Sequence, residues 1–302
     1  MRRSGGLRLS RSTTTARRQP GIVSPKAWPT PLHPPAGIIS PEADITVGAP
    51  ASGSPRSFRF PVSNSQAWAI FQRLPVPLQN RIKSVWRRLP GNRPRWGNLR
   101  RLQPFSAYYG FDRGTPVDRP YIDAWLTEHA HLIRGRTLEI RSAEYSMRYG
   151  SELESCDVMD IDPANPAATI VADANERGSL RPDYYDCIIL TQTLQFLDPP
   201  RAIDNLYSAL RPGGNLLISV PSASRVEPHC EHSDFYRWTP AGLRRLLQTL
   251  EGAHVAVQGR GNLLTVVAHL HGLVAEELRE EELRFTDARY PLVAFATVQK
   301  PA

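Results

Sequence analysis

The chain of 302 residues is long enough for one large domain and an appendage, but short for two compact domains. It carries 37 Lys and Arg against 29 Asp and Glu, yet residues 1–103 hold 18 of the bases and two acids, which leaves 19 bases and 27 acids in the remainder. A basic arm is therefore joined to an acidic domain near residue 100. No apolar run in the sequence approaches the ~20 residues that would span a bilayer.

Residues 1–65 form a basic arm rich in Arg, Ser, Thr and Pro. Such a composition buries too little apolar surface to offset the entropy of ordering, so we predict disorder. Its first acid is Glu42, and this lack of acids also resembles an organellar transit peptide. A flexible leader or an over-long start would have the same composition.

Residues 66–103 are predicted to hold short basic amphipathic helices and a linker, with Pro75 and Pro77 separating two helices. The favoured interpretation is a helix docked on the following domain with its charges in water. The alternative is a membrane-surface or nucleic-acid patch, or a weak protein contact. The acidic domain disfavours nucleic acid as a partner, because it offers no wide phosphate footprint.

Residues 104–302 are predicted to form an α/β domain, because helix-like and strand-like hydrophobic periods alternate from residue 119 onward. Right-handed crossovers between such units give an open, doubly wound sheet. The predicted helices cover 119–133, 200–214, 239–250 and 265–278. The predicted strands cover 136–140, 155–162, 168–173, 185–192, 215–221, 253–261 and 291–300.

Acidic residues follow three of these strands, at the sheet edge where ligands bind in doubly wound folds. The alternation of Val158, Asp160 and Asp162 places Asp162 nearest the strand end, where a carboxylate can accept hydrogen bonds from both ribose hydroxyls. Each acid also has a structural interpretation. Glu139 could cap a helix, Asp162 could fix a turn with Pro163, and Asp173 could be a solvated charge.

Five segments resemble, in order and spacing, the motifs of class I S-adenosylmethionine-dependent methyltransferases of the type 11-like kind. The resemblance covers about residues 115–300 and implies a Rossmann-like sheet of about seven strands, mostly parallel with an antiparallel last strand. It also implies S-adenosyl-L-methionine as cofactor. The segments are LEI at 138–140, DIDPANP at 160–166, VAD at 171–173, YDCIILTQTLQFL at 185–197 and ALRPGGNLLISVP at 209–221.

The resemblance also implies the cofactor contacts. It puts Glu139 near the methionine end, Asp162 on the ribose, Asp173 by the adenine, and Thr191 and Gln192 along the pocket wall. The chain departs from the family's GxGxG loop, since it has no glycine between Arg141 and Gly150. Arg141 could instead pair with the methionine carboxylate.

The segment 227–238 follows the fifth strand and concentrates titratable and aromatic groups. We interpret His229 or His232 as the base for a hydroxyl or protonated amine acceptor. Tyr236, Arg237 and Trp238 are candidate substrate contacts. We assign no metal site, because His229, Cys230 and His232 lack a fourth ligand from elsewhere.

The leading functional interpretation is methyl transfer to a small molecule or glycan, and the alternative is a non-catalytic methyltransferase-like module that binds a partner, such as a glycan-assembly enzyme. Residues 108–123 and 232–247 resemble a bacterial branch associated with surface glycans. Three scattered cysteines indicate a reducing compartment, so we expect a cytoplasmic protein.

Overall fold

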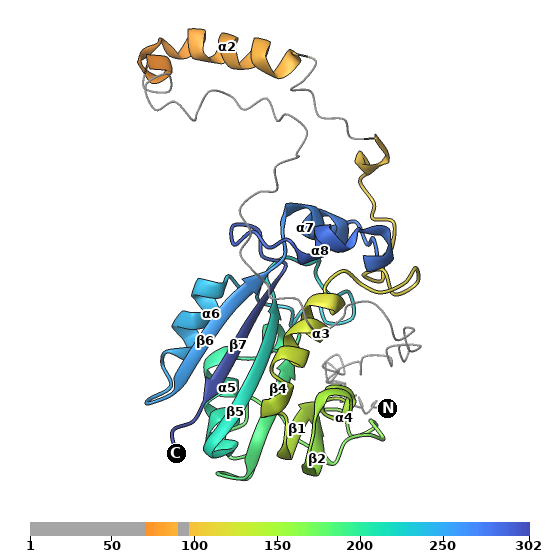
Figure 1. Cartoon of the computed structure of the whole chain (residues 1–302), viewed down its shortest axis with the longest axis vertical. Helices are drawn as coiled ribbons and strands as arrows, with labels where there is room; N and C mark the ends of the chain where they lie inside the picture. Colours follow the sequence, from red (N-terminus) through yellow and green to blue (C-terminus); the bar gives the residue numbers. More distant parts are fainter. Residues whose placement is uncertain (1–69, 90–96) are drawn as a thin grey trace, which may run out of the picture.

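The computed structural model describes residues 70–89 and 97–302, so the predicted arm over 1–65 lies outside the described residues. One seven-stranded sheet forms the centre of the domain, in the order β3-β2-β1-β4-β5-β7-β6 (Figure 1). The strands are β1 (Gly135–Ile140), β2 (Leu153–Asp160), β3 (Ile170–Val171), β4 (Tyr185–Thr191), β5 (Leu210–Pro221), β6 (His254–Arg260) and β7 (Val293–Gln299).

The sheet has the predicted strand directions. β1 pairs in parallel with β2 and β4, and β4 pairs in parallel with β5. β7 lies between β5 and β6 and is antiparallel to both. The prediction of about seven strands, mostly parallel with an antiparallel last strand, is therefore confirmed.

Helices cover both faces of the sheet. On one face, α5 (Pro199–Ala209) and α6 (Pro240–Leu247) bury Leu206 and Leu243 in a cluster with Ile188 and Ile218. On the other face, α3 (Arg119–Glu128) buries Trp125 against Phe295 of β7, with ring centroids 4.9 Å apart. α4 (Glu144–Tyr149), α7 (Leu263–Leu270) and α8 (Glu280–Arg284) complete this second cluster.

Several predicted boundaries are wrong, because two helices end before their hydrophobic patterns do and β5 begins five residues before the predicted strand 215–221. The helix predicted over 200–214 ends at Ala209, since Pro212 disfavours a helical conformation at the residue before it. Gly213, with φ +79°, lies in the first part of β5. The helix predicted over 265–278 ends at Leu270, and a short 3-10 turn, Ala275–Glu277, follows.

A separate helix, α2 (Val76–Arg88), precedes the domain. Pro75 is its N-cap and Pro77 lies in its first turn, so the predicted break between two helices falls at Pro75. α2 buries none of its residues, and the predicted docking of this helix on the domain is therefore wrong for the described part of the chain. No helix among residues 70–89 and 97–302 has the length and apolar character to cross a membrane.

Candidate cofactor and active site

The carboxyl ends of β1, β2, β4 and β5 meet at one edge of the sheet because these strands are parallel. Figure 1 shows α7 and α8 at this same end. Two loop contacts join the strand ends: Asn165 donates from Nδ2 to the carbonyl of Arg141 at 2.8 Å and to Oδ2 of Asp160 at 2.7 Å. The loop after β1 is thus held against the loop after β2.

Glu139 holds the loop after β1 from inside the domain. It is 1% exposed, and its two carboxylate oxygens accept hydrogen bonds from the backbone N–H groups of Tyr145 (3.0 Å) and Ser146 (2.8 Å), in the first turn of α4. Burial raises the pKa of Glu139 from 4.5 to about 7, although both N–H groups favour the carboxylate. The structure therefore gives Glu139 the helix-capping position and makes it a positioning group for the loop.

Arg141 has a left-handed backbone in the loop where the family carries glycines. Its φ is +71°, in the region that costs a non-glycine residue about 1–2 kcal/mol. Gln192, just past the end of the neighbouring strand β4, has φ +46°. Strained backbone of this kind is common at functional sites. These two positions are therefore candidates for the functional site.

Arg141→Gly should be more stable than Arg141→Ala by about 1 kcal/mol in free energy of unfolding, because only glycine adopts this φ without strain. Both variants lack the guanidinium, so the difference isolates the backbone. Urea denaturation of the two chains measures it. Equal stabilities would mean that the left-handed conformation at this position costs nothing.

The ribose assignment rests on two acids at the end of β2. The strand ends at Asp160, so the reasoning that placed Asp162 nearest the strand end is wrong by two residues. Asp162 lies in the following turn, where its Oδ1 accepts from the N–H of Ala164 at 2.9 Å. Asp160 accepts from the N–H of Asp162 at 3.0 Å. Both acids therefore support the turn, and Asp160 is the one at the strand tip.

The candidates after β3 and β4 also make local contacts. Asp173 accepts from the N–H of Asn175 at 2.8 Å, which fixes the turn after β3. Thr191 is the last residue of β4, and its carbonyl accepts from the hydroxyl of Thr193 at 2.8 Å. Gln192 donates its backbone N–H to the carbonyl of Ser219 on β5 at 2.8 Å. These residues line the same sheet edge as Arg141 and Asp160.

The loop after β5 is organised by Arg237. Its guanidinium forms a two-point contact with Asp234, with one N···O distance of 2.8 Å, and also donates to the carbonyls of Ser224 and Arg225. Arg237 therefore has a structural role in this loop. His229 and His232, the predicted bases, are exposed on its outer turn.

Aromatic side chains of this loop line an open hollow of about 480 Å³. Tyr236 is 40% exposed and its ring lies 5.4 Å from that of Trp238. Phe235 is 61% exposed and its backbone N–H donates to the carbonyl of Gln195 at 3.0 Å. The hollow is lined by Asn175, Phe196, Leu197, Asp198, Pro200, Phe235 and Tyr236.

A buried histidine of α7 lies near the same edge of the sheet. His269 of α7 is 6% exposed, and its Nδ1 lies 4.0 Å from Oδ1 of Asp118. Both atoms are buried without a hydrogen-bond partner, as is Nε of Arg225 from the loop after β5. Tyr109 packs over this group, with its ring 5.9 Å from His269 and 4.1 Å from the Arg225 guanidinium. Helical periodicity gives no signal for such a cluster, because its members come from distant segments.

His269 should make stability fall toward low pH. Burial lowers the pKa of His269; Asp118 opposes this shift, while Arg119 and Arg225 add to it. Below the ordinary value of 6.5 the unfolded chain takes up a proton that the folded chain resists, so the free energy of unfolding decreases as pH falls. In urea denaturation at several pH values, His269→Gln should flatten this decrease. The exposed His229→Gln should leave it unchanged, and a parallel change in both variants would contradict the assignment.

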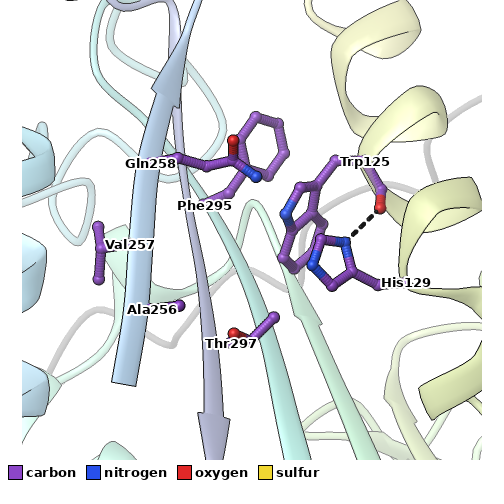
Figure 2. Close-up of a pocket in the computed structure, with 7 residues that line it drawn as sticks. All are labelled: Trp125, His129, Ala256, Val257, Gln258, Phe295 and Thr297. Atoms are coloured by element: carbon purple, nitrogen blue, oxygen red, sulfur yellow. Dashed lines mark hydrogen bonds between the residues drawn. The ribbon is translucent and has the colours of Figure 1, made fainter. Parts of the chain in front are cut away.

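A second, small cavity of about 90 Å³ lies at the opposite end of α3 from Arg119. Figure 2 shows Trp125 and His129 facing Phe295 and Thr297 of β7 across it. His129 Nδ1 is 2.8 Å from the carbonyl of Trp125, and the two rings are 4.7 Å apart. These contacts assign His129 to packing.

The sheet has the strand order and strand directions that the methyltransferase resemblance implies, and comparison with known proteins agrees. A family model described as a methyltransferase domain matches residues 98–278. The chain belongs to this methyltransferase-domain family. A comparison with curated proteins finds no match.

Similar solved structures include two S-adenosylmethionine-dependent methyltransferases. The one from Archaeoglobus fulgidus is 18% identical with a TM-score of 0.42, and the match covers 60% of this chain and 94% of that chain. The one from Mesorhizobium loti is 15% identical with a TM-score of 0.41, and the match covers 61% and 98% of the two chains.

Proposed function

We propose that the protein transfers a methyl group from S-adenosylmethionine to a small-molecule or glycan acceptor with a ring that stacks on aromatic side chains. The observation that carries this proposal is the hollow lined by Phe196, Phe235 and Tyr236 beside the carboxyl edge of the sheet. Aromatic faces bind the apolar side of a sugar or other ring, and an open hollow admits a large acceptor. The free thiols of Cys156 and Cys187 support a cytoplasmic location as part of the same proposal.

The cofactor contacts in this proposal follow the strand ends. Asp160 accepts the ribose hydroxyls, with Asp162 fixing the turn beside it, and Asp173 faces the adenine. Arg141 pairs with the methionine carboxylate. Thr191 and Gln192 form the wall after β4. Glu139 acts through the loop that it holds.

When bound, S-adenosylmethionine supplies an already activated methyl group, so the protein chiefly has to align the acceptor with it. A hydroxyl acceptor additionally needs a base. We assign that role to His269, because its imidazole is buried, its Nδ1 lies 4.0 Å from Oδ1 of Asp118, and burial lowers its pKa. The exposed His229 and His232 are the alternatives.

Calorimetric titration of the full chain with S-adenosylmethionine and S-adenosylhomocysteine tests the first part of the proposal. Binding of both ligands with one site per chain is expected. Lack of binding at millimolar ligand would favour the non-catalytic module, which the arginine in place of the first glycine also favours.

Transfer of a radioactive methyl group to a panel of free sugars, nucleotide sugars and phenols tests the acceptor class. Tyr236→Ala should raise the KM for a transferred acceptor while the affinity for S-adenosylhomocysteine stays unchanged, because Tyr236 touches only the acceptor in this proposal. His269→Gln should lower kcat for hydroxyl acceptors, whereas the double variant His229→Gln, His232→Gln should not.

A further inference from the structure

The helix α2 presents an apolar stripe to solvent. Leu78, Ile82, Val85 and Leu89 follow one another at spacings of four, three and four residues, so they lie on one face of the helix. Their side chains are 43%, 37%, 57% and 48% exposed. An exposed aliphatic row of this kind on a short helix marks a contact surface.

Cations flank this stripe. Arg81 and Arg88 lie along one side of it, given 100° of rotation per residue, while Lys83 and Arg87 lie on the polar face. The helix contains no acidic residue. A helix with an apolar stripe, a cationic border and a polar back is suited to lie in the plane of a membrane surface.

Local contacts stabilise this helix without the domain. Gln79 donates from Nε2 to the carbonyls of Gln72 (3.2 Å) and Leu74 (2.8 Å), which ties the preceding turn to α2. The Lys83 ammonium lies 5.5 Å from the centre of the Phe71 ring. Arg87 and Arg88 lie in the last turn, where their positive charges interact favourably with the negative end of the helix dipole.

We propose that α2 binds the surface of an anionic lipid bilayer, with Leu78, Ile82, Val85 and Leu89 inserted between the head groups and Arg81 and Arg88 on the lipid phosphates. The aliphatic stripe favours a lipid surface over a nucleic acid as the partner. Nucleic acids are bound by cationic side chains and stacking aromatic rings, and an exposed aliphatic row contributes to neither contact. The net negative charge of residues 104–302 favours an arrangement in which only α2 lies on the anionic surface.

Sedimentation of the full chain with vesicles tests this proposal. The probes are vesicles of phosphatidylcholine alone and of an equal mixture with phosphatidylserine. Binding to the mixed vesicles is expected to be at least about tenfold stronger and to weaken as salt is added. Equal binding to both kinds of vesicle would overturn the proposal.

The double variant Ile82→Ser, Val85→Ser isolates the stripe, because serine has about the same helix propensity as the residues it replaces. It should lower binding to the mixed vesicles at least about tenfold. The matched control exchanges two residues of the polar face, Asn80→Ser with Ser84→Asn, and should bind as the parent chain does.

Two outcomes would assign α2 to another partner. Vesicle binding that survives the serine variant but falls with Arg81→Gln, Arg88→Gln would indicate a purely electrostatic contact, and stronger capture by RNA would then identify nucleic acid. A lower thermal midpoint of the domain in the serine variant would indicate docking on the domain. Either result overturns the lipid proposal.

Discussion

Replacing Glu139 with alanine is expected to lower the free energy of unfolding by about 3 kcal/mol, because two buried backbone N–H groups, those of Tyr145 and Ser146, lose their common acceptor. Urea denaturation at pH 7.5 measures the loss. Met147→Ala, at a residue of the same helix that is 70% exposed, should change stability by less than about 0.5 kcal/mol. A loss in Glu139→Ala no larger than in this control would contradict the capping role.

Glu139 should also make the free energy of unfolding depend on pH. Its folded pKa of about 7 lies above the ordinary 4.5, so between these values the folded carboxyl keeps a proton that the unfolded one releases. The part of the Glu139 contribution that comes from its raised pKa is therefore present below pH 4.5 and lost as the pH rises through 7, whereas the two hydrogen bonds from backbone N–H groups remain at pH 7.5. Glu139→Gln should remove this component, which has the opposite sign to that of His269.

Replacing Asp160 with asparagine is expected to weaken binding of S-adenosylhomocysteine at least about tenfold, because a hydrogen bond from a hydroxyl to a charged acceptor contributes about 1.5–3 kcal/mol. Asp162→Asn should weaken it less than about threefold, since an amide oxygen can still accept the N–H of Ala164. Calorimetry on both chains, each checked for an unchanged thermal midpoint, gives the comparison. A larger loss in Asp162→Asn would return the ribose role to that residue.

The sequence predicted the sheet well, because each strand has its own hydrophobic run and the glycines, prolines and acids mark the strand ends. The alternation of helices and strands from residue 119 onward indicated seven strands, and the family resemblance implied that the last of them is antiparallel. The ends of elements were harder to predict. At β2 the alternation of Val158, Asp160 and Asp162 continues past the last paired residue, and only the ladder to β3, where Asp160 pairs with Val171, shows that the strand ends at Asp160.

The site was predictable where it follows strand ends and unpredictable where distant segments meet. Arg141 was predicted as a cofactor contact from its place in the loop. Its left-handed backbone could not be predicted, because arginine rarely adopts that conformation. The spacing of His269 fits a helix face and gives no sign of its neighbours Asp118 and Arg225, which lie about 150 and 44 residues away in the chain. The packing of the loop after β5 on α7 brings them together.

The short connections on one side of the sheet have a further consequence. Residues 161–184, all of which the structure describes, contain no helix between β2, β3 and β4, and β3 has only two paired residues. Amide hydrogens at this margin should exchange through small local openings, whereas those of β4 and β5 exchange only when the whole domain unfolds. Asp160 and Asp173 stand on the margin that opens most easily. Cofactor contacts with these two acids would suppress the local opening of this margin. The bound nucleoside would then stabilise the folded domain in addition to serving as the methyl donor's binding group.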